Sequence, residues 1–226
     1  MNENFLTTGK KYFAARKVGL FLLLYVAFLL AAGILLMLFS RAGINLWVNR
    51  HYGYFGDLFF KWYTYVGDGI FSLLVIVILL AIEYRKALVV FLSWAVSGIL
   101  VQFLKIVVFS DVARPVAYFK DIASLHLVDG VKVYTSQSFP SGHSASAFAL
   151  FLCLSFFSRK KYMQLIYFLL ALLVGYSRIY LSEHFLTDVM GGSSIGVFVA
   201  LLFIFVFYRD ERFLSLNRSV FSKSAE

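Results

Sequence analysis

The sequence contains little proline, cysteine or charge. Its 226 residues include two prolines, one cysteine and 15% charged residues, whereas 61% are hydrophobic. The single Cys153 excludes a disulfide within one chain, and the scarcity of proline argues against a disordered tail or several linked domains. So few charges cannot cover the surface of a soluble domain of this length, and the mean hydropathy of +0.82 favours an integral membrane protein.

The charge that is present is mainly basic. The formal net charge is +9, a balance that is also typical of proteins that bind nucleic acid. The Lys and Arg residues cluster beside apolar stretches, however, where they anchor helices and meet anionic lipid. We therefore expect the membrane bilayer as a partner and no nucleic acid.

Hydropathy predicts an all-α fold, an integral membrane bundle of six transmembrane helices. A hydrocarbon core of about 30 Å requires about 20 residues per helix, and six apolar stretches have about this length, the fourth being the shortest. They are Val18–Phe39, Tyr63–Ile82, Ala87–Val108, His143–Phe157, Met163–Tyr180 and Val189–Tyr208. The connections between them are compact, except for one long outer loop at 109–140. We expect the chain 1–226 to form a single domain.

The distribution of basic residues predicts the orientation of these helices. Thirteen of the 21 Lys and Arg residues lie on the side of the N-terminus, and the remaining eight lie on the other side. By the positive-inside rule both termini are then cytoplasmic. The basic segment before the first helix resembles a signal peptide, but the apolar stretch continues to Phe39, which favours an uncleaved anchor. Short connections and this charge pattern favour a bacterial inner membrane.

Three polar clusters lie where apolar helices meet loops, and all three fall on the outer side. They are Lys105 with Arg114-Pro115, then Pro140-Ser141-Gly142-His143, then Ser177-Arg178 followed by His184 and Asp188. Together they supply three cations, two imidazoles and a carboxylate. Such a set suits the binding of a phosphate group and nucleophilic attack on its phosphorus.

The second and third clusters each have a chemical rationale. Ser141 and Gly142 precede an apolar helix, so the free backbone N–H groups of its first turn form an anion site. His184 and Asp188 are four residues apart, which predicts that they share one face of a helix with Ser182 as its N-cap. The carboxylate would fix the imidazole tautomer and leave the other ring nitrogen free to attack. Because this cluster offers no third metal ligand, we expect no metal and no cofactor.

Two of the clusters resemble signature motifs of the type 2 phosphatidic acid phosphatase superfamily. Pro140-Ser141-Gly142-His143 matches the second motif, and Ser177-Arg178-x5-His184-x3-Asp188 matches the third. The first motif departs from the family pattern in its spacing, because the family usually has Lys-x6-Arg-Pro and this chain has Lys105-x8-Arg114-Pro115. We expect the two extra residues to form a wider turn after the helix.

The resemblance implies a role for each matched residue. His184 is expected to be the nucleophile, Asp188 the carboxylate that orients it, and His143 the proton donor to the leaving alkoxide. The residues expected to hold the phosphate are Lys105, Arg114, Ser141, Gly142 and Arg178. The family needs no metal.

We therefore expect a lipid phosphate phosphatase whose active site faces the periplasm. Phosphatidic acid, phosphatidylglycerol phosphate, undecaprenyl pyrophosphate and the phosphates of lipid A are all candidate substrates, because the motifs bind phosphate and do not distinguish among lipids. The alternatives are a lipid phosphotransferase with the same site, a vanadate-dependent peroxidase and a non-catalytic protein that binds lipid phosphate. Six spans disfavour the peroxidase, and retention of both His and the Asp disfavours the non-catalytic protein. The sequence specifies no oligomeric state.

One acidic residue lies outside the three clusters. Asp68, within Gly67-Asp68-Gly69, is near the outer end of the second predicted helix and on the same side as the clusters. We interpret it as part of a turn at the membrane interface. Contact with the site or with a lipid headgroup is the alternative.

Overall fold

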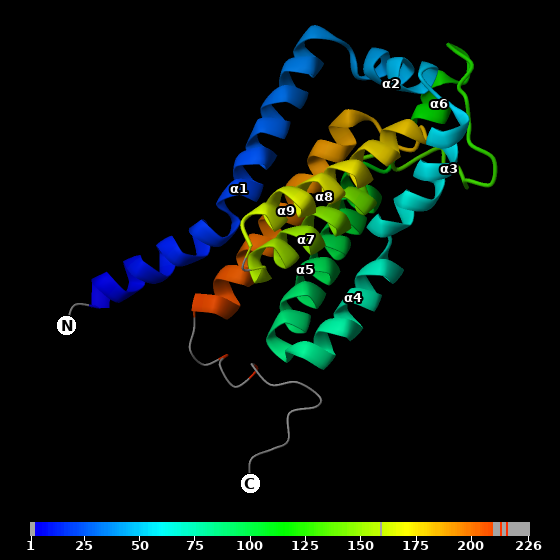
Figure 1. The fold of residues 1–226 in the computed structure, drawn as a ribbon. Coiled ribbons are helices and arrows are strands. Elements are labelled where there is room, and N and C mark those ends of the chain that lie inside the picture. Colours follow the sequence, from blue (N-terminus) through cyan, green and yellow to red (C-terminus); the bar gives the residue numbers. More distant parts are fainter. Residues whose placement is uncertain (1–2, 159, 210–212, 214–215, 217–226) are drawn as a thin grey trace.

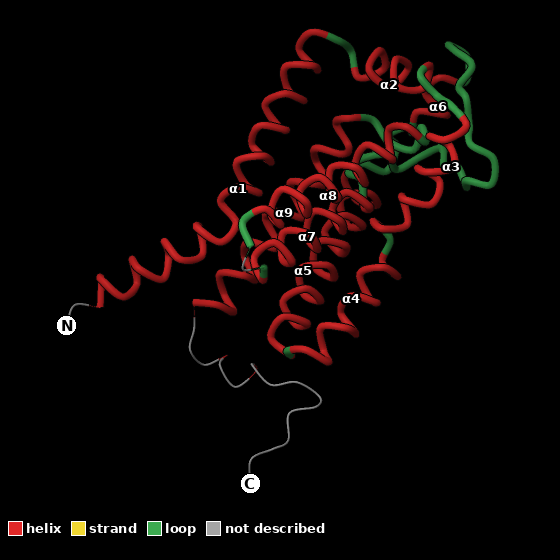
Figure 2. Tube along the Cα trace, in the orientation of Figure 1, coloured by secondary structure: helices red, strands yellow, loops and turns green. Residues whose placement is uncertain are grey.

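The computed structural model describes residues 3–158, 160–209, 213 and 216, with side chains from Val18 onward. This part of the chain is helical and contains no strand, which confirms the all-α prediction (Figure 2). The α-helices are α1 (Glu3–Leu38), α2 (Arg41–Arg50), α3 (Tyr54–Tyr63), α4 (Gly69–Ile82), α5 (Tyr84–Phe103), α6 (Pro115–Phe119), α7 (Gly142–Phe157), α8 (Tyr162–Tyr180) and α9 (Leu186–Arg209). A 3-10 turn, Thr64–Gly67, follows α3, and a π-helical turn, Leu104–Val108, follows α5. Four basic residues counted for the orientation, Arg159, Arg212, Arg218 and Lys223, lie outside the described residues.

Helix α7 forms the centre of the bundle. It packs against α5, α8 and α9, while α1 and α4 lie on the outside (Figure 1). Almost every side chain of α7 from Ser144 to Phe156 is buried. Alanine and serine alternate with larger apolar residues on all of its faces, and a helix that is apolar all round belongs in a core.

Helices α7 and α9 approach each other closely at two glycines. Gly192 and Gly196 of α9 lie against the backbone carbonyl groups of Ser141 and Ala145, and a Cβ atom at either glycine would overlap them. Small residues allow such close contact between membrane helices, which van der Waals packing then stabilises. The contact holds the start of α9 beside the start of α7, where the Ser141 amide donates a hydrogen bond to the Asp188 carbonyl at 2.9 Å.

Four segments of the described chain are long and apolar enough to cross a membrane: Val18–Leu38, Tyr84–Val108, Tyr162–Tyr180 and Leu186–Arg209. They correspond to four of the six predicted spans. The predicted span Tyr63–Ile82 is not one helix, because the segments Tyr54–Gly67 and Gly69–Ile82 meet at an angle of 54°; together they would make a fifth span. Helix α7 has only 16 residues. The arrangement of six spans therefore remains a prediction.

The break in the second span lies at Asp68, because this residue caps the helix that follows it. The Asp68 backbone is extended, with ψ at 154°, and its side chain accepts a hydrogen bond from the Ile70 amide at 3.3 Å. Aspartate is among the residues that most favour this position. The prediction of a continuous helix was wrong because hydropathy does not register a single capping residue.

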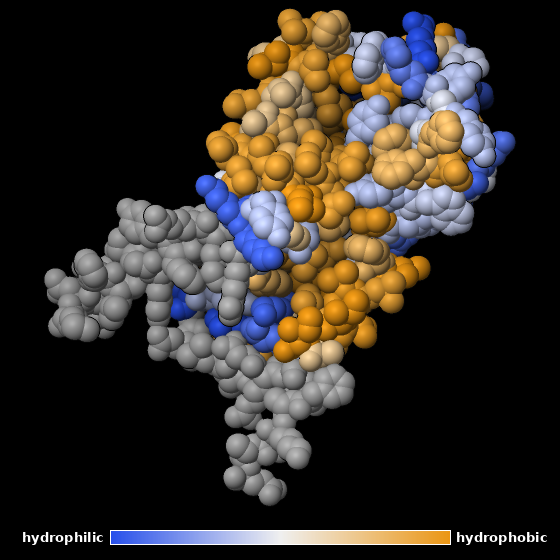
Figure 3. All heavy atoms as spheres, viewed as in Figure 1, coloured by the Kyte–Doolittle hydropathy of each residue, from blue (hydrophilic) through white to orange (hydrophobic). Residues whose placement is uncertain are grey.

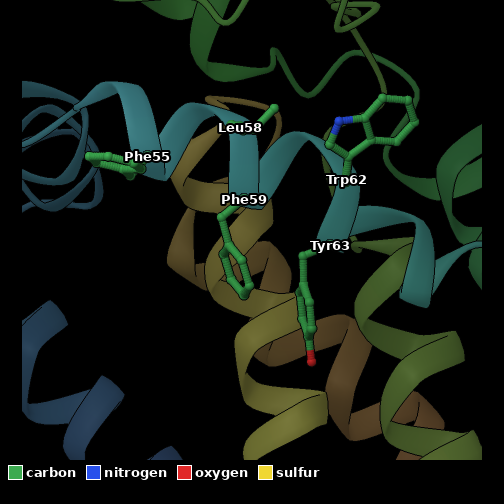
Figure 4. Close-up of a pocket in the computed structure, with 5 residues that line it drawn as sticks. All are labelled: Phe55, Leu58, Phe59, Trp62 and Tyr63. Carbon is green, nitrogen blue, oxygen red and sulfur yellow. The ribbon is translucent and has the colours of Figure 1, made fainter.

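Two helices occupy the stretch between the first two predicted spans, where the sequence predicts only a compact connection. Helix α2 begins after Ser40, whose hydroxyl accepts a hydrogen bond from the Gly43 amide at 3.0 Å. Helix α3 carries an aromatic surface, and a groove of about 700 Å³ runs along it (Figure 4). The groove is lined by Phe55, Leu58, Phe59, Trp62 and Tyr63.

The long loop 109–140 lies at the same end of the molecule as α2 and α3 (Figure 2). Its single helix, α6, begins with Pro115, whose fixed φ suits the first position of a helix. Asn49 holds the loop in place, because its side chain accepts from the His126 amide at 3.0 Å and donates to the His126 carbonyl at 2.8 Å. Hydrophilic residues gather at this end, and hydrophobic residues cover the face over α1 and α4 (Figure 3).

The close contact between α7 and α9 yields a stability prediction. Gly196→Ala introduces a methyl group against the Ala145 backbone, and such overpacking should lower the free energy of unfolding by about 1–3 kcal/mol. Gly33→Ala in α1 is the matched control, because nothing lies within 4 Å of a Cβ atom there; alanine favours the helix by about 1 kcal/mol. Thermal unfolding in detergent measures both. Equal unfolding midpoints for the two variants would contradict the packing described here.

Candidate active site

The three clusters that the sequence predicts to converge do meet at one end of the bundle. The second and third are joined by the hydrogen bond between the Ser141 amide and the Asp188 carbonyl. The first and third are joined by an ion pair between Arg114 and Glu183. The site therefore gathers side chains from the ends of α5, α7, α8 and α9 and from the loop 109–140.

His184 and Asp188 form a buried pair, but not on one helix surface as predicted. Helix α9 begins at Leu186, so His184 lies in the preceding turn, and its Nδ1 is 3.4 Å from Asp188 Oδ2. Ser182 is not an N-cap. Its φ is +54°, and its hydroxyl instead accepts a hydrogen bond from the Asn49 side chain at 3.0 Å. The prediction was wrong because the spacing of four residues also fits a tight turn that leads into a helix.

Asp188 is held firmly by neighbours other than the histidine. Its Oδ2 accepts hydrogen bonds from the Ser138 hydroxyl at 2.6 Å and from the Phe185 amide at 2.9 Å. The carboxylate is thus fixed from the long loop on one side and from the start of α9 on the other. An orienting carboxylate that is itself held in this way fixes the tautomer of its imidazole.

The charge state of His184 suits a nucleophile. The ring is 2% exposed, and this burial lowers the pKa of His184 to about 3, which the nearby Asp188 opposes only in part. The imidazole is therefore neutral near pH 7. With Nδ1 turned toward Asp188, the Nε2 lone pair is the one available to attack.

The start of α7 has the form of an anion site. Ser141 is the N-cap of the helix, and its hydroxyl accepts hydrogen bonds from the Ser144 amide at 3.4 Å and from the Ser144 hydroxyl at 2.9 Å. Gly142 leaves the first turn open, since only Val101 comes within 4 Å of the position of a Cβ atom. His143 follows in the same turn. The free amides and the helix dipole favour a negative charge here.

The two cations of the first cluster reach the site despite their unusual spacing. The π-helical turn Leu104–Val108 absorbs part of the insertion, since such a turn holds an extra residue. The Lys105 ammonium donates to the Gln137 carbonyl at 2.9 Å, and Arg114 Nε donates to the Ser136 carbonyl at 3.0 Å. Both side chains thus meet the same short segment of the loop.

Arg178 is positioned from two sides. Its Nη1 donates to the Thr64 hydroxyl at 2.6 Å, and its Nη2 lies 3.3 Å from Glu183 Oε2. Its Nε is buried and has no partner among the described residues. A buried guanidinium whose Nε is unpartnered among these residues suits a phosphate oxygen, because that oxygen accepts a charge-assisted hydrogen bond.

Glu183 is the main residue of the site that the sequence analysis did not identify. It is 1% exposed, and its Oε2 bridges the guanidinium groups of Arg114 and Arg178. Burial raises the pKa of the Glu183 carboxyl, and the two arginines oppose that rise. A glutamate next to the predicted nucleophile was the available signal, since a charge that is buried in a site requires a partner.

No group of three or more His, Cys, Asp and Glu side chains in the described part of the chain is arranged to hold a metal ion. The prediction of no metal and no cofactor concerns the reaction itself, and it stays a prediction.

The geometry of the site agrees with a known family. The PAP2 superfamily model matches residues 86–212, which is more than half of the chain and includes all three clusters. The chain belongs to the PAP2 superfamily. The resemblance seen in the motifs is thus confirmed.

Three PAP2 relatives of assigned activity match part of the chain. Phosphatidylglycerophosphatase B of Bacillus subtilis is 41% identical over 87 residues, covering 34% of this chain and 41% of the relative. Undecaprenyl-diphosphatase BcrC of the same species is 29% identical over 108 residues, covering 48% of this chain and 51% of the relative. Lipid A 4′-phosphatase of Bacteroides thetaiotaomicron is 33% identical over 87 residues, covering 38% and 39%. The chain thus spans about half or less of the length of each.

Two crystal structures of PAP2 proteins are similar over most of their length. LpxE of Aquifex aeolicus has 28% identity and a TM-score of 0.63, covering 71% of this chain and 92% of that protein. A transmembrane PAP2-type phosphatidylglycerolphosphate phosphatase of Bacillus subtilis has 28% identity and a TM-score of 0.62, covering 85% of this chain and 98% of that protein. Together with the apolar helices, this similarity identifies a helical membrane protein of the PAP2 type.

The bridge made by Glu183 yields a prediction about stability. Glu183→Gln leaves two buried guanidinium groups without a counter-charge, which should cost about 3–5 kcal/mol of unfolding free energy. The control is Asp121→Asn, because Asp121 is an exposed residue of the loop 109–140, and exposed charges contribute less than about 1 kcal/mol. Thermal unfolding in detergent compares them. Inorganic phosphate should raise the unfolding midpoint of Glu183→Gln more than that of the native protein. Equal responses would contradict the bridging role.

Proposed function

We propose that this protein is a membrane lipid phosphate phosphatase that hydrolyses a lipid phosphomonoester or pyrophosphate through a phosphohistidine, without a metal ion. The observation that carries the proposal is the state of His184. Its ring is buried, which lowers the pKa of the imidazole, and its Nδ1 faces Asp188. It also follows directly after Glu183, which pairs with two of the cations. Binding alone would need the cations but not an oriented imidazole. The relatives' names, which refer to lipid phosphates, support the same substrate class.

The first step forms the phosphoenzyme. Nε2 of His184 attacks phosphorus, an N–P bond forms, and the bond from phosphorus to the ester oxygen breaks. His143, which carries a proton once the phosphate dianion lies beside it, gives that proton to the leaving alkoxide, and the alcohol departs. Asp188 stabilises the positive charge that His184 acquires.

The cations and the start of α7 stabilise the transition state of this step. Negative charge spreads over the three equatorial oxygens of the phosphoryl group, and donors that are already in place stabilise it without reorganisation. Lys105, Arg114 and Arg178 supply the charged donors, and the backbone amides after Ser141 and Gly142 supply the neutral ones.

The second step releases the phosphate. Water attacks the phosphorus of the phosphohistidine while His143, now neutral, takes a proton from that water. The N–P bond breaks, neutral His184 is restored, and inorganic phosphate leaves. His143 ends the cycle protonated, ready to act as an acid again.

The same proposal includes six spans, with both termini in the cytoplasm and the site at the periplasmic face of a bacterial inner membrane. In it the bent pair Tyr54–Gly67 and Gly69–Ile82 is the second span, and α7 is the fourth. The placement of all three clusters at the end that carries the loop 109–140 supports this arrangement, since six alternating spans require it. The chain 1–226 is then one domain.

The non-catalytic alternative loses the feature that favoured it. The longer spacing of the first motif does not remove Lys105 or Arg114 from the site, since both contact the loop segment beside Asp188. A lipid phosphotransferase would form the same phosphoenzyme and differ only in the acceptor, so release of inorganic phosphate separates the two functions.

The test is phosphate release by the purified protein in detergent with EDTA, across a panel of lipid phosphates. We expect release that survives EDTA and falls by at least about a thousandfold in His184→Ala. His51→Ala is the control, because His51 is an exposed residue at the end of α2 whose ring contacts the Trp47 carbonyl. Loss of release in EDTA, or substantial release by His184→Ala, would contradict the mechanism.

A further inference from the structure

The break in the second span is packed directly against His143. Gly67 lies against the His143 backbone and the Val174 side chain, and Gly69 lies against Trp94, so that a Cβ atom at either glycine would be 3.0 Å or less from its neighbours. The two glycines therefore allow the turn to approach the start of α7. Asp68 stands between them.

A cavity of about 140 Å³ opens between this turn and His143. Of the described residues that line it, Asp68 and His143 are the titratable ones, and the others are glycines, Trp94 and Ser146. No described residue donates a hydrogen bond to Asp68 Oδ2, since its one such contact is the Ile70 amide on Oδ1. The cavity thus offers an acceptor for hydrogen bonds near the predicted proton donor.

Asp68 also lines a second cavity, of about 270 Å³, which continues toward the apolar surface. Ile70 and Leu74 border it, and they are 69% and 59% exposed, as expected of side chains that face lipid. Trp62 borders it as well and belongs to the aromatic groove on α3. Asp68 therefore lines both the cavity beside His143 and the cavity at the lipid-facing surface.

We propose that Asp68 binds the alcohol that leaves, and that the protein prefers lipid phosphomonoesters whose alcohol carries a free hydroxyl beside the phosphate. This rests on the proposed function, in which the leaving oxygen takes its proton from His143 and so must lie against it. A carboxylate accepts a hydrogen bond from such a hydroxyl. The carboxylate gains no hydrogen bond from an alcohol without a neighbouring hydroxyl, and it repels a leaving oxygen that itself belongs to a phosphate.

Three lipids with defined leaving groups separate these cases. Phosphatidylglycerophosphate leaves an alcohol with a neighbouring hydroxyl, phosphatidic acid leaves diacylglycerol without one, and an isoprenyl diphosphate leaves an isoprenyl phosphate anion. We expect the native protein to have its highest kcat/KM on phosphatidylglycerophosphate, by about 10- to 100-fold, as for sites that hydrogen-bond a substrate hydroxyl.

Asp68→Asn keeps the size of the side chain and the helix cap but removes the charge. It should lower kcat/KM on phosphatidylglycerophosphate by about tenfold. It should change kcat/KM on phosphatidic acid by less than about twofold, and it should leave kcat/KM on the isoprenyl diphosphate unchanged or raise it. Asp68→Ser, which also caps helices, is the second variant if the first is unstable. Asp129→Asn in the exposed loop is the control.

Two results would overturn the inference: a native preference for phosphatidic acid or the diphosphate, or a change in the Asp68 variants that is equal for all three lipids. Failure of the native protein to release phosphate from any of them would instead overturn the proposed function.

Discussion

Three cationic side chains are buried at one end of a bundle of apolar helices, and the surrounding structure compensates their charge. Lys105, Arg114 and Arg178 are 7%, 8% and 6% exposed, and charges withdrawn from water to this degree require hydrogen bonds and counter-charges. The carbonyls of residues 136 and 137 and the carboxylate of Glu183 supply them. The loop 109–140 supplies these carbonyls, and the turn before α9 supplies this carboxylate. Both segments therefore hold the three cations in place, where an anion could bind.

The close packing of α7 and α9 links this charge to the chemistry. Gly192 and Gly196 allow the two helices to pack so closely that the Asp188 carbonyl accepts a hydrogen bond from the Ser141 amide. The anion site at the start of α7 and the His184–Asp188 pair then belong to one rigid unit. In the proposed mechanism the nucleophile and the oxyanion site are thus fixed to each other and need no reorganisation when a phosphate binds, so packing within the bundle would serve the reaction.

The sequence was sufficient to predict the residues of the motifs and their convergence, because alternating spans and fixed spacings are properties of the chain itself. It predicted a turn at Asp68, which the structure confirms, but it placed this turn at the end of the second span and not within it, since hydropathy averages over a window in which one capping residue has little weight. It also did not reveal Glu183 or Ser138, whose roles depend on contacts with residues 69 and 50 positions away. The turn that carries His184 was mistaken for a helix, because the spacing of four residues suits both.

The central claim, that His184 carries the phosphoryl group, is tested most directly by trapping the phosphoenzyme. The native protein would be mixed with a phosphate ester labelled at phosphorus, quenched in alkali, where an N–P bond persists, and mapped by mass spectrometry of its peptides. His143→Gln would be treated with p-nitrophenyl phosphate, whose leaving group needs no acid, so that only hydrolysis of the intermediate is slowed. The account predicts a label on His184 that accumulates in this variant. A label on another residue, or phosphate release by the native protein with no labelled enzyme in either protein, would contradict it.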